Sequence, residues 1–129
     1  KSATIQEGFK KLSQYQIDNL NGLKQIAETA IEVILEEDIE QLGFLLDETW
    51  RFKKHSNKGV SNPRIDEIYE KAKKAGAWGG KISGAGGGGF ITFMCDPEHQ
   101  ENLKITMAKL GCDWYDFSSD FNGLEVRIL

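Results

Sequence analysis

The chain has 129 residues, a net charge of −4 and a hydrophobic fraction of 40%. This length and composition predict one folded domain that needs neither a disulfide nor a metal ion for stability. The basic residues are scattered over a mildly acidic chain, which argues against nucleic acid as a partner.

The sequence also bounds the location of the protein. No apolar run approaches the about 18 residues of a membrane-spanning helix, and the first residues, KSATIQEGFKK, lack a signal-peptide core. We therefore expect a cytoplasmic protein without a membrane partner. The chain starts without Met inside a helical pattern, which favours a fragment of a longer polypeptide. Cys95 and Cys112 have no CxxC spacing, so we expect reduced, buried thiols and no zinc site.

The first half of the chain predicts a helical hairpin. The apolar residues of its first helix recur at helical spacing: Ile5, Phe9, Leu12, Leu20, Leu23, Ala27, Ala30, Ile31 and Ile34. The pattern leaves room for a break between Ser13 and Gly22, because Asn21-Gly22 is a turn signal. Asp38 and Gln41 form a candidate capping box for the second helix. This helix runs to about residue 54, with a buried stripe made of Leu42, Leu45, Leu46 and Thr49.

A third helix is predicted after the polar loop HSNKGVSN, residues 55–62. Asn62 is its expected N-cap and Pro63 its first helical residue. Its inward positions are Ile65, Ile68, Tyr69, Ala72 and Ala75. Gly76 is expected to end it. Asp66 and Glu67 lie in the first turn, where carboxylates favour the helix dipole, so we interpret them as structural and not as a catalytic pair.

The periodicity then changes to short apolar and β-branched runs. WGGKIS (78–83) and FITFMC (90–95) predict two strands, and Asp96-Pro97 begins a helix that turns Leu103, Met107 and Leu110 inward and stops at Gly111. CDWYDF (112–117) and LEVRIL (124–129) predict two final strands joined around Asn122-Gly123. This order of elements predicts an α+β fold with a mostly antiparallel sheet of about four strands and helices on one face.

A run of glycines links the two middle strands. It consists of Gly84, Ala85, Gly86, Gly87, Gly88 and Gly89, and each glycine costs roughly 0.5–1 kcal/mol relative to Ala. The run contains GxGxxG, but a dinucleotide site requires a helix after the loop, and here a strand follows. A protein-kinase glycine loop is excluded because VAIK, HRD and DFG elements are lacking.

Two interpretations of the run remain from the residues alone. A flexible turn needs only one or two glycines. Close approach of bare backbone N–H groups to an anion or to another element is the interpretation we favour. Lys81 and Ser83 lie just before the loop, where they can add charge-assisted contacts or point to solvent.

The stretch GAWGGKISGAGGGGFITF, residues 76–93, resembles the third conserved motif of the GHMP kinase superfamily, which includes galactokinase and mevalonate kinase. Upstream residues resemble the subgroup of D-glycero-D-manno-heptose 7-phosphate kinases and fucokinase-like sugar kinases: Trp50, Lys53, Ser61, Asn62, Pro63, Ile65 and Asp66. The resemblance starts near Leu20. It implies that residues 1–129 form the ferredoxin-like C-terminal domain of such a kinase, without the N-terminal ATP-binding and catalytic domain.

The resemblance implies transfer of the γ-phosphoryl group of ATP to a small-molecule hydroxyl, with ATP and Mg²⁺ bound mainly by the N-terminal domain. Gly84 to Gly89 would then lie near the triphosphate, while Lys81, Ser83, Ser61 and Asn62 would contact the substrate. The family's phosphate loop, Pro-x-x-x-Gly-Leu-x-Ser-Ser, has no counterpart here. We therefore assign neither a catalytic residue nor a metal ligand to this chain.

Our hypothesis from the sequence is a sugar kinase that phosphorylates the anomeric hydroxyl of a heptose 7-phosphate. Its partners would be the sugar or sugar phosphate and the N-terminal domain of the same kinase, and the sequence leaves an oligomer open. The alternatives are a stand-alone ferredoxin-like module that binds a small anion without catalysis, and a purely structural interaction domain.

Overall fold

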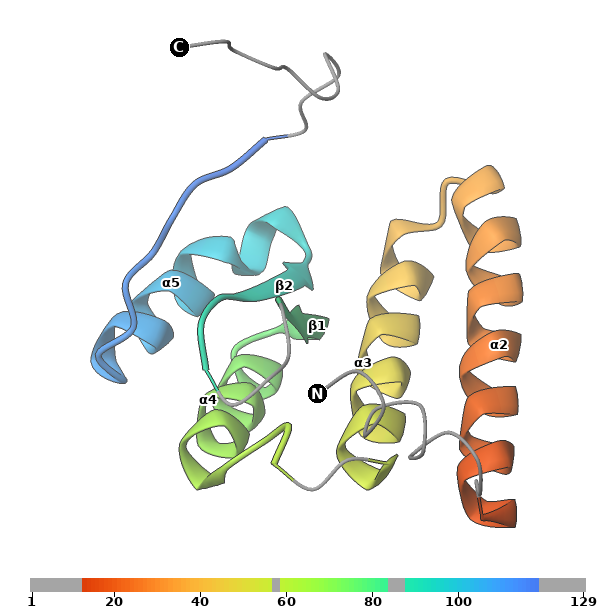
Figure 1. The fold of residues 1–129 in the computed structure, drawn as a ribbon. Helices are drawn as coiled ribbons and strands as arrows, with labels where there is room; N and C mark the ends of the chain where they lie inside the picture. The colour runs from red at the N-terminus through yellow and green to blue at the C-terminus, as the bar shows by residue number, and fades with distance from the viewer. Residues whose placement is uncertain (1–12, 57–58, 84–87, 119–129) are drawn as a thin grey trace, which may run out of the picture.

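The computed structural model describes residues 13–56, 59–83 and 88–118 (Figure 1). It contains α2 (Gln14–Leu35), α3 (Ile39–Ser56), α4 (Pro63–Lys74), β1 (Ala77–Ile82), β2 (Ile91–Cys95), the short 3₁₀ helix η1 (Pro97–His99) and α5 (Gln100–Lys109). The two strands lie between α3 on one side and α4 and α5 on the other (Figure 1). No helix in the described part of the chain combines the length and the apolar character needed to cross a membrane.

The first described helix, α2, begins at a complete capping box. Ser13 Oγ accepts a hydrogen bond from the Gln16 N–H at 3.3 Å, and Gln16 Oε1 accepts from the Ser13 N–H at 2.9 Å. The helix then passes through Asn21-Gly22 without a break. Gly22 lies against α3, because a Cβ there would come within 2.7 Å of the Phe52 ring. This glycine therefore lets two helices approach and does not mark a turn.

The face that α2 buries differs from the predicted one. Its buried residues are Asn19, Ile26 and Val33, at seven-residue spacing. Leu20, Ile31 and Ile34, predicted to face inward, are more than half exposed at 52%, 62% and 57%. The prediction was wrong because α2 carries apolar residues on two faces, and in the described structure only one of them packs, against α3 through Leu45.

The starts of the next two helices confirm the predicted caps. Asp38 Oδ1 accepts from the Gln41 N–H at 2.9 Å ahead of α3, so Asp38 is an N-cap, but its own N–H bonds to Val33 O and the predicted capping box with the Gln41 side chain does not form. Asn62 Oδ1 accepts from the Ile65 N–H at 3.0 Å, with Pro63 as the first residue of α4. Gly76 follows α4 with a φ of 110°, a backbone conformation that glycine adopts at little cost.

The sheet has two antiparallel strands among the described residues, β1 and β2. Ile82 pairs with Ile91 and Gly80 with Phe93, and the register shifts between Ala77 and Gly79. Both predicted middle strands are confirmed. The four-stranded sheet is not: residues 112–117 form no strand, since no described strand pairs with them, and 124–129 lie outside the described residues. The α+β class itself is confirmed.

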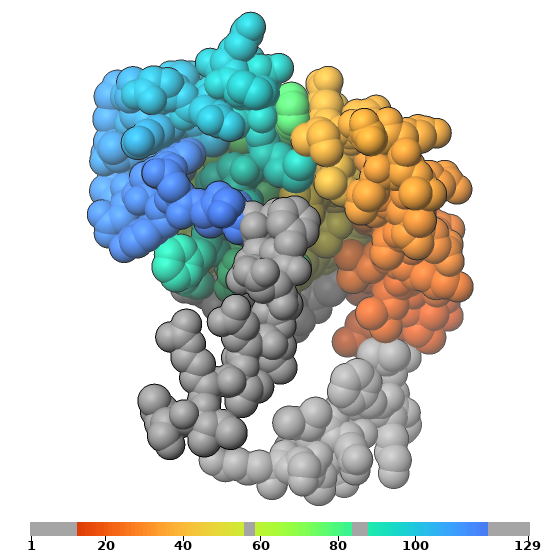
Figure 2. Space-filling model, turned by 90° about the horizontal axis from the view of Figure 1, so that it is seen from above, coloured from red at the N-terminus to blue at the C-terminus, as the bar shows by residue number. Residues whose placement is uncertain are grey.

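Two apolar clusters hold the strands against the helices. One contains Trp50, Val60, Ile65, Tyr69 and Ile82. The other contains Ala72, Ala75, Ala77, Leu103 and Met107. Phe93 of β2 packs against both clusters, so the middle of the sheet ties them together. In the space-filling view, α5 and the residues after it lie on one side of the molecule, and α2 with α3 lie on the other (Figure 2).

Candidate functional site

The glycine run connects β1 to β2 as the tip of a hairpin. The Ser83 N–H donates to Phe90 O at 2.9 Å and closes the base of the connection. Gly84 to Gly87 lie outside the described residues. Gly89 is described, is exposed and has a φ of 100°, in the range that L side chains avoid.

The last two glycines of the run stand in open surroundings. A Cβ placed on Gly88 would meet no atom within 4 Å, and one on Gly89 would meet only Ser83 O, at 3.9 Å. Within the described residues, nothing that packs here explains the choice of glycine. The backbone at this point is accessible from outside, as contact with an external anion requires.

A pocket of about 200 Å³ joins the end of the glycine run to the start of α4. Its lining residues come from α4 and its N-cap, from both strands and from the loop: Asn62, Arg64, Ile65, Ile68, Ile82, Gly88, Gly89 and Ile91. The lining combines four isoleucine residues with two glycines, the asparagine and the arginine. This composition suits an anion or a polar small molecule.

The N-terminus of α4 lends the pocket positive electrostatic character. The first N–H groups of a helix lack acceptors within the helix, and the aligned peptide dipoles attract negative charge. Asn62 caps one of these groups through the Ile65 N–H. Arg64 also lines the pocket, while its Nη1 forms an ion pair with Glu67 at 3.0 Å. Sequence reasoning did not single out Arg64, whose only signal is its place two residues after the N-cap.

Ser61 lies beside the pocket and bonds to the first turn of α4. Its Oγ donates to Asp66 Oδ1 at 2.8 Å, and Lys54 Nζ contacts the same oxygen at 3.2 Å. Partial burial opposes ionisation, but the hydrogen bond from Ser61 and the Lys54 ammonium together keep the pKa of Asp66 below its usual value. These contacts tie the 59–62 loop and the end of α3 to α4.

A buried network fixes β1 ahead of the loop. The Gly80 N–H donates to Tyr69 Oη at 3.1 Å, and Tyr69 Oη lies 3.1 Å from Asp47 Oδ1. Asp47 Oδ2 pairs with Arg51 Nη2 at 2.8 Å and with Lys73 Nζ at 3.5 Å. Burial, and then the Asp47 carboxylate, raise the pKa of Tyr69. The tyrosine therefore stays neutral and holds the strand.

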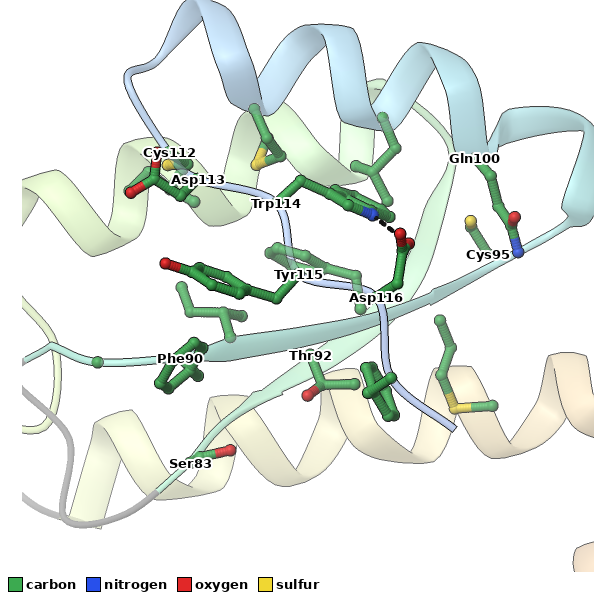
Figure 3. A pocket seen from close by; sticks show the side chains of 18 residues that line it. Ser83, Phe90, Thr92, Cys95, Gln100, Cys112, Asp113, Trp114, Tyr115 and Asp116 are labelled. Carbon is green, nitrogen blue, oxygen red and sulfur yellow. Dashed lines mark hydrogen bonds between the residues drawn. The ribbon is translucent and has the colours of Figure 1, made fainter. Parts of the chain in front are cut away.

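The structure brings together part of the predicted site. Asn62, Gly88 and Gly89 line one pocket, whereas Ser61 does not line it and bonds instead to Asp66 in the first turn of α4. Lys81 is exposed on β1 and does not line this pocket. Ser83 lines a larger cavity of about 1050 Å³, whose lining also includes residues 90–95 and 112–117 (Figure 3).

Metal binding can be tested on the described residues alone. Among them, no group of three or more His, Cys, Asp or Glu side chains is placed to hold a metal ion. The two cysteines are free and half-buried. We therefore place no metal ligand on the described part of the chain.

Comparison with known proteins identifies the class. The family model of the GHMP kinases C terminal matches residues 30–110. This match covers α3, α4, both strands and α5, and with them the pocket at the glycine run. The chain belongs to the C-terminal domain family of the GHMP kinases.

The relatives of this chain are named as kinases of different substrates. The chain is 35% identical over 109 residues to D-glycero-alpha-D-manno-heptose 7-phosphate kinase of Campylobacter jejuni. It is 30% identical over 110 residues to mevalonate kinase of Saccharolobus solfataricus, and 27% identical over 89 residues to the bifunctional fucokinase/GDP-fucose pyrophosphorylase of Arabidopsis thaliana. These matches cover 84%, 83% and 68% of the chain. They span 32%, 32% and 8% of the relatives' own lengths.

Proposed function

We propose that this chain is the C-terminal domain of a cytoplasmic, ATP-dependent kinase that phosphorylates a hydroxyl of a sugar or sugar phosphate. The observation that carries the proposal is the pocket between the glycine run and α4, inside the region matched by the family model. Phosphoryl transfer depends mainly on positioning and on stabilising phosphate charge, and backbone N–H groups suit both tasks.

The described residues suit the phosphate groups of a nucleotide better than they suit a metal ion. Among the hydrogen bonds between described residues, none uses the N–H of Gly88 or Gly89. Gly88 also leaves open the space that a Cβ would take. In our proposal the run from Gly84 to Gly89 contacts the phosphates of ATP. Mg²⁺, which neutralises phosphate charge when bound, would be held by the N-terminal part of the kinase.

The proposed substrate contacts differ in whether the pocket supports them. Asn62 and Arg64 border the pocket, so we assign them to binding a negatively charged or hydroxyl-rich substrate. Ser61 positions this edge through Asp66. Lys81 and Ser83 lie elsewhere on β1 and just after it, so for them a substrate contact rests on the resemblance alone.

A heptose 7-phosphate is the acceptor that we favour, with phosphorylation at its anomeric hydroxyl. The support is the 35% identity to the relative named as a heptose 7-phosphate kinase. The family match favours a kinase over a stand-alone anion-binding module.

The test uses the full-length product of the gene with ATP and Mg²⁺. The candidate acceptors are D-glycero-D-manno-heptose 7-phosphate, mevalonate and L-fucose, and the readouts are ADP release and ³¹P NMR of the product. We expect turnover with the heptose phosphate and a new phosphate signal at its anomeric position. Preference for mevalonate or fucose would overturn the acceptor, and no turnover with any of the three would count against the kinase.

The 129-residue chain alone serves as the comparison. Under the same conditions we expect no turnover, because the proposed Mg²⁺ ligands and catalytic groups lie outside it. Turnover by this chain would contradict our proposal that the catalytic groups and Mg²⁺ ligands lie in the N-terminal part of the kinase. Tight binding of ATP or phosphate by the chain in isothermal titration, together with an inactive full-length protein, would support the binding module instead.

A further inference from the structure

The second apolar face of α2 is exposed in the described structure. α2 lies at the outer side of the molecule, and α3 separates it from the two strands (Figure 1). Its buried residues pack against α3. The exposed residues of the other face form what we call the α2 stripe: Ile17, Leu20, Lys24, Ala27, Ile31 and Ile34. Its four isoleucine and leucine side chains are 39% to 62% exposed.

The α2 stripe has the spacing of a contact line between two packed helices. Its members follow one another at alternating intervals of three and four residues, as the core positions of a coiled coil do. The buried face of α2 also has a period of seven, at Asn19, Ile26 and Val33. Ile31 comes five residues after Ile26, which places it about 140° further round the helix. The helix therefore carries two separate packing faces, and the described residues cover one of them.

Lys24, in the middle of the stripe, sets the direction of a partner helix. In a parallel pair of identical helices each residue meets its own copy, so two lysines would come together. In an antiparallel pair the apolar residues meet apolar residues and each lysine meets the smallest member of the stripe. The facing pairs, each present twice, are Ile17 with Ile34, Leu20 with Ile31, and Lys24 with Ala27.

Charges beside the stripe favour the same antiparallel arrangement. Lys24 Nζ lies 3.7 Å from Glu28 Oε1 on its own helix, and both side chains are largely exposed. Glu28 directly follows Ala27, the residue that Lys24 faces across an antiparallel pair. The lysine stem can then cover the alanine while its ammonium reaches the glutamate of the other helix. Two lysines and two glutamates alternate at the centre, so the stripe is complementary to a copy of itself.

Two observations favour a second copy over another part of the same polypeptide. The family model begins at residue 30, so most of the stripe precedes the region that the model matches. A contact that all kinases of the family share is expected inside that region, whereas an oligomer contact can differ between relatives. Ile5 and Leu12 precede Asn19 by fourteen and seven residues. Their spacing therefore continues the buried face of α2 and not the stripe.

We propose that the α2 stripe is the interface of a homodimer, in which α2 packs antiparallel against α2 of a second copy about a two-fold axis. Each helix is already folded against α3, so association does not require the entropy loss of ordering it. The strands and the glycine run lie beyond α3 (Figure 1). The inference does not rest on the proposed kinase activity, and an inactive protein can still form this dimer.

Sedimentation velocity of the full-length gene product over a range of concentrations tests the proposal, and we expect a dimer that dissociates on dilution. Ile31→Glu places a carboxylate from each copy in the apolar contact and should raise the dissociation constant at least roughly 100-fold. Ile105→Glu, the same change at an exposed isoleucine of α5, is the matched control and should leave it unchanged. An unchanged thermal midpoint of the dilute protein verifies that each variant folds. A monomer at every concentration, or equal constants for the two variants, would overturn the proposal.

Two charge variants test whether the lysine and the glutamate pair between copies. Lys24→Glu leaves only glutamates at the centre of the contact, and Glu28→Lys leaves only lysines, so each variant alone should dimerise about tenfold more weakly. In an equal mixture they should form a heterodimer of nearly the original affinity, because each lysine then meets a glutamate of the other variant. A pair that acts only within its own helix gives no gain on mixing, and that result contradicts the proposal.

Disulfide formation tests the direction of the helices, in a background where Cys95 and Cys112 are replaced by alanine. On oxidation of a mixture of Ile17→Cys and Ile34→Cys proteins, we expect a bond between position 17 of one and position 34 of the other. Cross-linking of Ile17→Cys with itself would show a parallel pair and contradict the proposal. So would a dimer that forms only after residues 1–12 are deleted, because these residues would then cover the stripe.

Discussion

Two pairs of glycines, nine residues apart, lie in opposite physical environments. On β1, a Cβ on Gly79 would lie 2.1 Å from Gly43 O, and one on Gly80 would lie 2.7 Å from Thr92 O. At the end of the loop, a Cβ on Gly88 would meet nothing within 4 Å. Glycine therefore serves close packing in the strand and an open backbone in the loop. Substitution at the first pair should damage the fold, and at the second pair the site.

The largest effect is expected for Gly79→Ala. The new methyl group would overlap Gly43 O and approach Asp47 N at 2.7 Å, and both are backbone atoms that cannot turn aside. We expect α3 to be forced away from β1, at a cost of at least about 3 kcal/mol in unfolding free energy. Urea denaturation measures it. A loss below about 1 kcal/mol would show that α3 and β1 are not packed this closely.

A smaller loss is expected for Tyr69→Phe, which tests how β1 is held. The change keeps the ring in its cluster but removes the hydroxyl that contacts Gly80 and Asp47. A buried backbone N–H and a carboxylate then lose a partner, which costs about 1–3 kcal/mol. The readout is the urea midpoint, with Tyr15→Phe on exposed α2 as the control that should change nothing.

Gly89→Ala tests whether the open backbone at the end of the loop contacts a nucleotide, and Gly111→Ala is its matched control. Both positions have a positive φ, 100° and 70°, and neither has an atom closer than 3.9 Å to an added Cβ. Each change should cost roughly 1–2 kcal/mol of stability through backbone strain. In the full-length kinase only Gly89→Ala should also raise KM for ATP, by about tenfold, through displaced backbone donors. The same KM for both variants would argue against a nucleotide contact at Gly89.

The smallest effect is expected at Asp66, beside the pocket. Its pKa is lower in the folded state than the ordinary value of 3.8, so it stabilises the fold above that pH. The contribution is lost as the pH falls through the folded-state pKa. The side chain is 47% exposed, so solvent screening limits the contribution to about 0.5 kcal/mol or less. We expect Asp66→Asn to show this loss at pH 7 and none near pH 2, by urea denaturation. An equal loss at both values would contradict the ionic origin.

Local features of the fold were predictable from the sequence because they depend on neighbouring residues. Asp38 and Asn62 cap helices through hydrogen bonds three residues along the chain, and such spacing is visible in the sequence. The two strands around the glycine run were equally clear from their β-branched and aromatic residues. Of the candidate site, the contribution of Asn62 and the last glycines followed from a motif resemblance.

Features set by distant contacts were not predictable in the same way. The stripe of Leu20 and Ile31 has helical spacing but stays exposed, because the choice between two apolar faces depends on where α3 packs. Residues 112–117 read as a strand, yet strand formation needs a partner that the described residues do not supply. Arg64 joins a pocket lining only because Gly88 and Gly89 lie next to α4 in space.

The hydroxyl of Tyr69 on the edge of β1 also bears on how this domain behaves in concentrated solution. Continuous stacking of sheets into fibres requires two available edges on every molecule. With one edge occupied by Tyr69 and Lys73, each molecule has at most the β2 edge left for such pairing. The occupied edge of β1 therefore prevents this sheet from growing into a filament, whatever covers the edge of β2.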